Sequence, residues 1–231
     1  MASMYDIVRP SLNFNFRKSL ILPPRVSFTR SGTADYKDEI GATITAPANT
    51  PRLGKHNSNA NLPQGLVLGT GEVASLNDVS WLSTTAGTVL WVGALNSVAT
   101  TSILWGITDG VANSNYIRMR IDSATAGRLR LMASVATVVQ FTSDVMNPIA
   151  VDTRYMIATS WSGTTFRTVI NDQIQATSTS ADGVPVSLAS VAIGSPITGI
   201  SGAVMDGVVE RFTYWPFAMG LTQLRALTVP G

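Results

Sequence analysis

Apolar and polar side chains alternate in short runs through the last two thirds of the chain, about 8–15 residues apart. Alternation with a period of two is typical of β-strands that bury one face. Gly, Asn, Asp and Ser between the runs favour turns, and the runs themselves are rich in the β-branched and aromatic residues that suit a pleated sheet. The pattern predicts strands at 88–95, 102–107, 116–121, 128–133, 138–142, 154–161, 165–171, 187–193 and 208–215.

Helical periodicity is nearly missing from the same sequence. Tight turns are predicted at 161–165 and 170–173, and one short helix at 222–227, with Pro230 beyond its end. The sequence therefore predicts an all-β antiparallel sandwich with one short C-terminal helix.

Composition changes near residue 65. Residues 1–65 carry eight Lys/Arg against four Asp/Glu, about +4, and the remainder about −2. Several prolines in this first part remove strand-pairing donors and favour extended backbone. We expect an extended basic N-terminal arm at 1–65 and a sandwich domain at 66–231. The alternative is that the basic part packs within a single domain.

Overall composition excludes several classes of protein. With 45% hydrophobic and 13% charged residues the chain is not a disordered one, and a net charge of +2 is too small for a dedicated nucleic-acid binder. No apolar run reaches the roughly 20 residues of a membrane helix, and we expect no targeting signal in the first residues. With no cysteine, disulfides and thiolate zinc sites are excluded.

Catalytic arrangements are also missing. Asp206 and Glu210, if both lie on one strand, are roughly 13 Å apart, farther than the carboxyl pair of a glycosidase. The single histidine, His56, lies in a polar loop without the neighbours of a serine triad. Gly65, Gly69 and Gly71 lack the Lys-Ser/Thr ending of a phosphate-binding loop. We expect no catalytic residue, no cofactor and no enzyme activity.

The loop at 109–115 is the one segment rich in potential calcium ligands. It offers Asp109, Asn113 and Asn115 together, but lacks the alternating acids and closing Glu of an EF-hand loop. Asp-Gly followed by Asn is also ordinary turn chemistry. We expect a turn and no metal site.

Residues 88–227 resemble the laminin-G and concanavalin A-like jelly-roll superfamily. The segments that carry the resemblance are 154–172, 192–194, 201–212 and 221–227. The resemblance implies two antiparallel sheets in a jelly-roll sandwich and a short closing helix.

The front of the chain resembles a segment common in virion proteins of tailed bacteriophages. The matching residues are FTRSGTADYKD at 28–38, TAPANTPR at 45–52 and GLVL at 65–68. The resemblance implies a non-enzymatic virion structural protein, made in the host cytoplasm, that binds the capsid exterior as a decoration or cement protein. Its partners would be the major capsid protein or other virion proteins. The alternative is a receptor-binding module of a tail or head fibre that recognises a host glycan.

Arginines form the strongest candidate binding feature. Alternation places Arg118 and Arg120 on one face of their strand, and Arg128 and Arg130 alternate with leucines on the next. If 122–126 forms the loop, Arg120 faces Arg128 and Arg118 faces Arg130. Opposed like charges are destabilising, so we expect this face to bind an acidic capsid neighbour or an anionic glycan. The alternative is a solvated face neutralised by acids of the same chain, such as Asp152 or Glu210.

Basic residues of the arm are further candidates for contact with acidic capsid subunits. They are Arg17, Lys18, Arg25, Arg30 and Arg52.

The five tryptophans divide into two groups. Four fall within or at the end of predicted strands and are expected in the core: Trp91, Trp105, Trp161 and Trp215. Trp81 lies outside a clear strand, where it packs under the arm or stacks on a sugar. Residues 88–95 are apolar on both faces apart from Thr88, which predicts cover from the arm or from another subunit, and hence a homo-oligomer.

Overall fold

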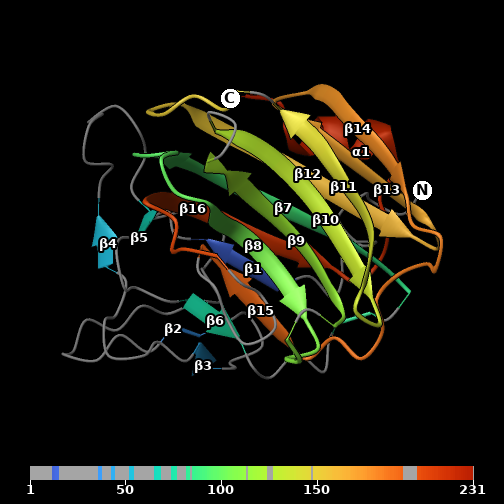
Figure 1. Ribbon diagram of the computed structural model, residues 1–231. Helices are drawn as coiled ribbons and strands as arrows, with labels where there is room; N and C mark the ends of the chain where they lie inside the picture. The colour runs from blue at the N-terminus through green and yellow to red at the C-terminus, as the bar shows by residue number, and fades with distance from the viewer. Residues whose placement is uncertain are drawn as a thin grey trace.

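The computed structural model is a sandwich of two antiparallel β-sheets (Figure 1). It describes residues 82–83, 85–112, 114–123, 127–146, 148–194 and 202–230, and the backbone of six short strands before them. These short strands are β1 (Leu12–Asn15), β2 (Tyr36–Lys37), β3 (Thr43–Ile44), β4 (Arg52–Gly54), β5 (Gly65–Leu68) and β6 (Ala74–Leu76). Within these ranges, no helix is long and apolar enough to cross a membrane.

The larger, eight-stranded sheet has the order β14-β13-β12-β7-β16-β5-β4, with β1 also beside β16. Its long strands are β7 (Ala86–Leu95), β12 (Arg154–Ser162), β13 (Thr165–Ile170), β14 (Gln173–Thr179) and β16 (Gly207–Trp215). The smaller, six-stranded sheet has the order β11-β10-β9-β8-β15-β6. Its strands from residue 100 onward are β8 (Ser102–Thr108), β9 (Tyr116–Asp122), β10 (Arg128–Val135), β11 (Val138–Met146) and β15 (Ser190–Ile193).

The predicted all-β sandwich is confirmed. Each of the nine predicted strands is present, and the predicted helix is α1 (Leu221–Leu227). Among the described strands from β7 onward, β14 is the one that the sequence did not reveal. It lies at the edge of its sheet, and most of its side chains are polar and at least partly exposed, so it shows no alternation of apolar residues.

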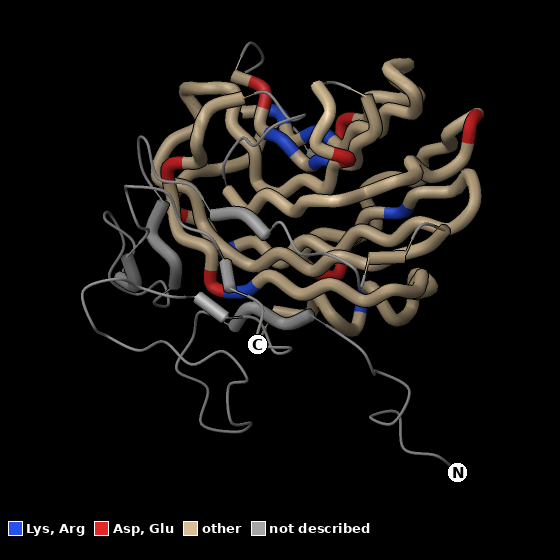
Figure 2. The backbone as a smooth tube through the Cα atoms, turned by 90° about the horizontal axis from the view of Figure 1, so that it is seen from below, with Lys and Arg blue, Asp and Glu red and all other residues tan. Residues whose placement is uncertain are grey.

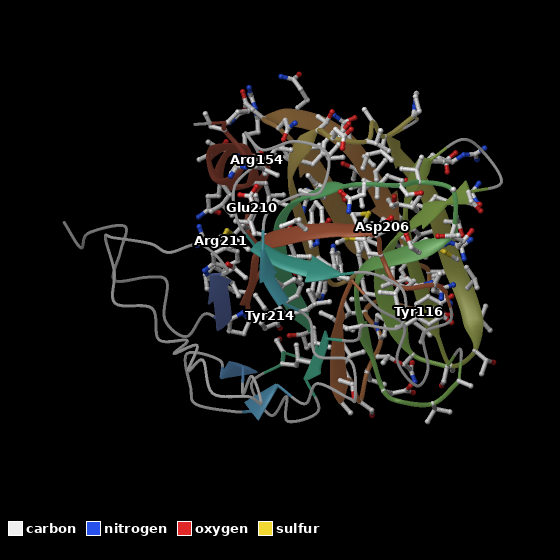
Figure 3. The ribbon with its side chains drawn as sticks, turned by 90° about the vertical axis from the view of Figure 1, so that its left-hand side faces the viewer. Tyr116, Arg154, Asp206, Glu210, Arg211 and Tyr214 are labelled. Atoms are coloured by element: carbon white, nitrogen blue, oxygen red, sulfur yellow. The ribbon has the colours of Figure 1, made fainter. Side chains whose placement is uncertain are left out.

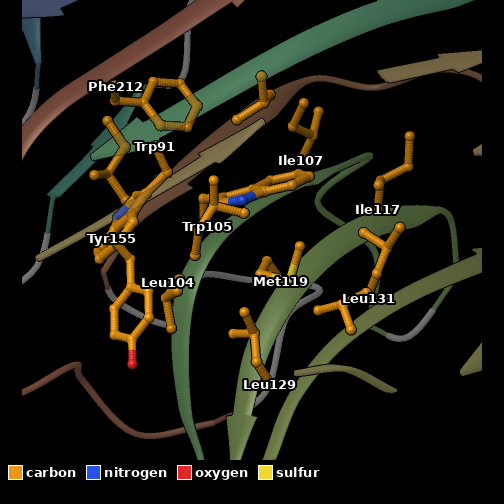
Figure 4. Packing of buried hydrophobic residues seen from close by; sticks show 14 of the residues in the cluster. Trp91, Leu104, Trp105, Ile107, Ile117, Met119, Leu129, Leu131, Tyr155 and Phe212 are labelled. Atoms are coloured by element: carbon orange, nitrogen blue, oxygen red, sulfur yellow. The ribbon is translucent and has the colours of Figure 1, made fainter. Parts of the chain in front are cut away.

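Three tryptophans lie at the centre of the core between the sheets. Trp91, Trp105 and Trp161 are fully buried, and the rings of Trp105 and Trp161 stack with centroids 6.5 Å apart. Tyr214 follows, with its ring 6.2 Å from Trp161. Figure 4 shows Trp91 and Trp105 together with the aliphatic side chains of β8, β9 and β10. The predicted core positions of these tryptophans, and of Trp215 at 3% exposure, are confirmed.

A β-bulge in β8 fixes which residues face that core. The pairing of β8 with β9 shifts register between Ile103 and Trp105, and both Leu104 and Trp105 join the core cluster. Ile103 is left on the outer side of the six-stranded sheet. A bulge inserts one residue and re-aims the side chains around it.

The outer face of β7 is covered by the chain's own C-terminal segment. Leu90 and Val92 pack in a cluster with Trp215, Met219 and Leu224, the last of these from α1. The prediction that the arm or a second subunit covers the outer side of residues 88–95 is therefore wrong for this part of the strand. After β16 the chain turns back and packs on the outer face of its own sheet. The alternation of residues within a strand does not predict such a return. Homo-oligomer formation stays a prediction, and the apolar outer face of β7 no longer supports it.

Two short strands of the predicted arm pair with the larger sheet. β1 pairs with β16, from Leu12 opposite Tyr214 to Asn15 opposite Arg211, and β4 pairs with β5. Most of residues 1–65 lies outside the described residues, so the division of the chain at residue 65 stays a prediction.

Replacing Leu224 tests the cover provided by α1. Leu224 is fully buried, and Leu224→Ala is expected to lower the free energy of unfolding by about 3 kcal/mol, because it removes buried methyl groups and leaves a cavity. The measurement is urea unfolding followed by tryptophan fluorescence. Thr222→Ala, at an exposed position of the same helix, is the control and should leave stability nearly unchanged. A Leu224→Ala protein as stable as this control would show that the helix does not seal the sheet.

Candidate anion-binding face

Four arginines lie on the outer side of two neighbouring strands of the six-stranded sheet. Ile117, Met119 and Ile121 of β9 point into the core, so the residues between them point outward. The same alternation holds in β10. We call this surface the arginine face; it comprises Arg118 and Arg120 of β9 with Arg128 and Arg130 of β10. In Figure 2, basic segments lie side by side on neighbouring strands with acidic segments next to them.

The predicted gathering of the four arginines is confirmed, but the predicted register is wrong. Arg130 lies opposite Arg120, whereas Arg128 lies opposite Asp122. The prediction paired Arg120 with Arg128 and Arg118 with Arg130. The difference is two residues, because Asp122 continues the strand instead of starting the loop. A register shift of two residues leaves every side chain on the same face of the sheet. The four arginines therefore share one face even though the predicted pairs were wrong.

Two aspartates lie among the arginines. Asp122 hydrogen-bonds the guanidinium of Arg130 and lies 3.7 Å from the Nη2 of Arg120. Asp144, on β11, accepts one hydrogen bond from Nη1 of Arg128 and one from Nε of Arg130, each 2.8 Å long. The described ion pairs thus join two carboxylates to the guanidinium groups of Arg120, Arg128 and Arg130.

These partners differ from the acids that the sequence suggested. Glu210 is 2% exposed and accepts two hydrogen bonds from Nε of Arg154, both 3.0 Å long, on the larger sheet. Figure 3 shows Arg154 beside Glu210, with Tyr116 of the six-stranded sheet on the other side of the sandwich. Among the described contacts, the acids that pair with the arginine face are Asp122 and Asp144, and Glu210 pairs with Arg154 instead.

Burial varies across the arginine face. Arg118 is 4% exposed, and its guanidinium lies 4.5 Å from the centre of the Tyr116 ring, within the range of a cation–π contact. Burial lowers the pKa of Arg118; the charge of Tyr116 raises it and that of Arg120 lowers it further. The side chains of Arg120, Arg128 and Arg130 each keep about a fifth of their surface exposed. Solvent therefore reaches the arginine face at Arg120, Arg128 and Arg130.

Apolar side chains border the arginines on the same side of the sheet. Ile103, Tyr116 and Met132 form a small buried cluster there, and Met132 lies opposite Arg118 in the ladder. Arginine stems pack well on such a surface while their charged ends remain available for polar contacts. Alternation along 116–121 already places Tyr116 on this face, whereas the sequence analysis did not single out Ile103 or Met132.

Chemically, the arginine face is suited to planar anions. A guanidinium group presents its donors in a fixed fork that matches two oxygens of a carboxylate. Among the described residues, Nε of Arg120 and Nε of Arg128 are buried and donate to no acceptor. A ligand's carboxylate would instead reach the exposed parts of Arg120, Arg128 and Arg130.

Asp144 is the member of this surface that the sequence analysis missed. The alternating pattern predicted a strand that ends at 142, whereas β11 continues to Met146. Two register shifts along the pairing of β10 with β11 interrupt the alternation. The only signal in the sequence was the position of Asp144, an acid two residues beyond the end of the predicted strand.

The remaining candidates have different outcomes. Arg17, Lys18, Arg25 and Arg30 lie outside the described residues, as do His56 and Trp81. Arg52 lies in β4, whose side chains are likewise outside the description.

The loop at 109–115 uses its oxygens for hydrogen bonds within the protein. Asp109 accepts from the backbone of Val111 and from the side chain of Asn115, both at 2.9 Å. Burial raises the pKa of Asp109, but these hydrogen bonds outweigh it and hold the pKa below 3.8. Over the ranges that the structure describes, no three His, Cys, Asp or Glu side chains gather in a way that could hold a metal ion.

The two carboxylates considered for glycosidase chemistry do not act together in the structure. Glu210 is held by Arg154, and Asp206 accepts a 2.8 Å hydrogen bond from the side chain of Asn96. Figure 3 shows Asp206 well apart from Glu210.

Comparison with solved structures finds domains of other proteins with a similar fold. The CBM40 of the Ruminococcus gnavus IT-sialidase, bound to α2,3-sialyllactose, has a TM-score of 0.60 at 15% identity, over 71% of this chain and 96% of that one. Domain 4 of AbnA, a GH43 extracellular arabinanase from Geobacillus stearothermophilus in complex with arabinotriose, has a TM-score of 0.62 at 16% identity. The match covers 84% of this chain and 93% of that domain.

Longer enzymes contain the same fold as one part. The K499G mutant of NanB sialidase from Streptococcus pneumoniae has a TM-score of 0.57 at 15% identity, and the match covers 72% of this chain but only 28% of the sialidase. No family model matches this sequence, and no curated protein does. The similarity defines the fold and extends over most of the sandwich.

Acid titration tests the pairing of Asp144. Burial raises its pKa, but hydrogen bonds and charge from Arg130 and Arg128 outweigh burial and hold the pKa below 3.8. A carboxyl group whose pKa is lower in the folded state stabilises the fold above pH 4 and loses that contribution as the pH falls through its folded pKa. Because Asp144 is 45% exposed, the contribution is expected to be below about 1 kcal/mol.

The measurement is the free energy of unfolding of wild type and Asp144→Asn at pH 6 and at pH 2.5. The difference between the two proteins should be present at pH 6 and shrink at pH 2.5. A difference that is the same at both pH values would contradict the ion pairing of Asp144.

Proposed function

We propose that this protein is a non-catalytic glycan-binding module whose arginine face binds an acidic sugar through its carboxylate. The observation that carries the proposal is the gathering of four arginines on one outer sheet surface, where Arg120, Arg128 and Arg130 each keep about a fifth of the side chain exposed. Bidentate arginine contacts recognise carboxylates with defined geometry, and each is about twice as strong as a neutral hydrogen bond.

The neighbouring structures support a sugar as the source of that carboxylate. The fold is shared with a CBM40 bound to sialyllactose, which carries one carboxylate, and with an arabinanase domain bound to arabinotriose, which carries none. The two ligands show that this sandwich is used for both acidic and neutral sugars. The charge of the arginine face favours an acidic sugar for the present chain.

We propose no hydrolytic role. Among the described residues, Glu210 is bonded to Arg154, and Asp206 is bonded to Asn96. Glycosidases in general need two cooperating carboxyl groups about 5–9.5 Å apart across the scissile bond. A bound oligosaccharide should therefore be recovered intact.

For the biological setting, we propose the virion of a tailed bacteriophage, with this module as a host-glycan receptor on a fibre or as a decoration protein on the capsid. The support is the sequence resemblance of residues 28–38 and 45–52 to virion proteins. The fold of carbohydrate-binding modules favours the receptor role over decoration.

A glycan array tests the proposed ligand class. The purified protein is expected to bind oligosaccharides that contain sialic or uronic acids over their neutral counterparts. Arg130→Gln and Arg128→Gln should each weaken this binding about tenfold, since each removes a charged donor pair. Arg225→Gln is the matched control, because Arg225 pairs with Asp172 at α1, away from the arginine face.

Equal binding of neutral and acidic glycans, or unchanged binding by both arginine variants, would contradict the proposal. Circular dichroism and thermal unfolding of each variant separate a lost contact from a lost fold.

Imaging of virions tests the proposed setting. If the chain is a fibre receptor, antibodies against it should label the tail or flexible projections in electron micrographs. Regular labelling of the capsid shell would favour the decoration role, and unlabelled virions would contradict both.

A further inference from the structure

We infer that Asp144 is an exchangeable carboxylate that occupies the place of the ligand's carboxylate between Arg128 and Arg130 and is displaced when the ligand binds. The inference rests on the proposed function and adds a residue that sets the affinity and the selectivity of the same surface. It follows from how differently the two aspartates of the arginine face are held.

Asp144 is bound in the manner of a ligand. Its two oxygens each accept one 2.8 Å hydrogen bond, from Nη1 of Arg128 and from Nε of Arg130. Two oxygens of one carboxylate thus bridge two arginines of the same strand. A carboxylate of an acidic sugar has the same charge and the same pair of oxygens, so it can accept the same two hydrogen bonds.

Asp144 is also the more accessible of the two acids. Its side chain is 45% exposed, against 11% for Asp122. It lies on β11, which is the edge strand of the six-stranded sheet, whereas Asp122 lies on the interior strand β9. Rotating the side chain of Asp144 into solvent therefore requires no rearrangement of a neighbouring strand.

Asp122 is suited to remain in place during such an exchange. It contacts Arg130 and Arg120, and in the ladder it lies opposite Arg128. It therefore compensates the repulsion between the opposed pair Arg120 and Arg130. Asp122 thus stabilises the arginine face, whereas Asp144 occupies the position that the carboxylate of the ligand would take.

The exchange replaces one ion pair with another, so its net cost is small. A change of two- to fivefold in an equilibrium constant corresponds to about 0.4–1 kcal/mol, which is within the range for a partly exposed ion pair. Removing the negative charge of Asp144 should therefore raise the affinity for an acidic sugar about two- to fivefold. A neutral sugar does not compete for the arginines, so its binding should not gain. Asp144 thus lowers the affinity of the face for acidic ligands, and a ligand binds well only when its carboxylate outcompetes that of Asp144.

The test is isothermal titration of the full chain with 3′-sialyllactose, a galacturonic acid trimer and lactose at fixed salt concentration. Asp144→Asn should bind at least one of the two acidic probes about two- to fivefold more tightly than wild type. Asp144→Glu, which keeps a carboxylate at this position, should bind no more tightly than wild type. Asp182→Asn is the matched control, because it removes an exposed negative charge that contacts Gln140 and no arginine in the described contacts.

The possible outcomes separate this inference from the proposed function. If Arg130→Gln loses the acidic probes while Asp144→Asn binds them as wild type does, or more weakly, the arginine face is the site and the exchange is wrong. Equal gains for Asp144→Asn and Asp182→Asn would show a general charge effect and would also overturn the exchange. If neither wild type nor any variant binds an acidic probe, the proposed function fails and the inference fails with it.

Discussion

The packing of the tryptophans between the two sheets is the constraint on which the rest of the structure depends. Trp105 stacks on Trp161, which in turn meets Tyr214, so strands from both sheets are held together by large buried rings. Because successive side chains of a strand point to opposite faces, committing one face to this core decides what the other face presents. In β9 and β10 the other face presents arginines.

Arginines on adjacent strands repel one another unless acids lie between them. Arg120 and Arg130 lie directly opposite each other, and like charges in that position are destabilising. Asp122 and Asp144 reduce this repulsion by pairing with Arg120, Arg128 and Arg130. In the proposed function an anion would contact the same arginines, so the same side chains would serve stability and binding.

The two outer faces of the sandwich have different roles in the described part of the chain. On the larger sheet, the segment after β16 returns over β7 and buries Leu90 and Val92 beneath α1. On the smaller sheet, three arginines and Asp144 retain solvent contact. The second arrangement gathers four arginines on one surface, which is why the proposed site lies there.

The sequence by itself determined the strands, the buried tryptophans and the common face of the four arginines, because alternation is a local property of each strand. Tertiary structure decided which residues lie opposite each other, since strand pairing depends on where the loop begins and on bulges such as that beside Ile103. It also decided the counterions. Asp144 reaches Arg128 and Arg130 from a neighbouring strand, and Glu210 is held by Arg154 on the opposite sheet. The pairing of side chains between strands is set by packing and register, and no local pattern in the sequence encodes it.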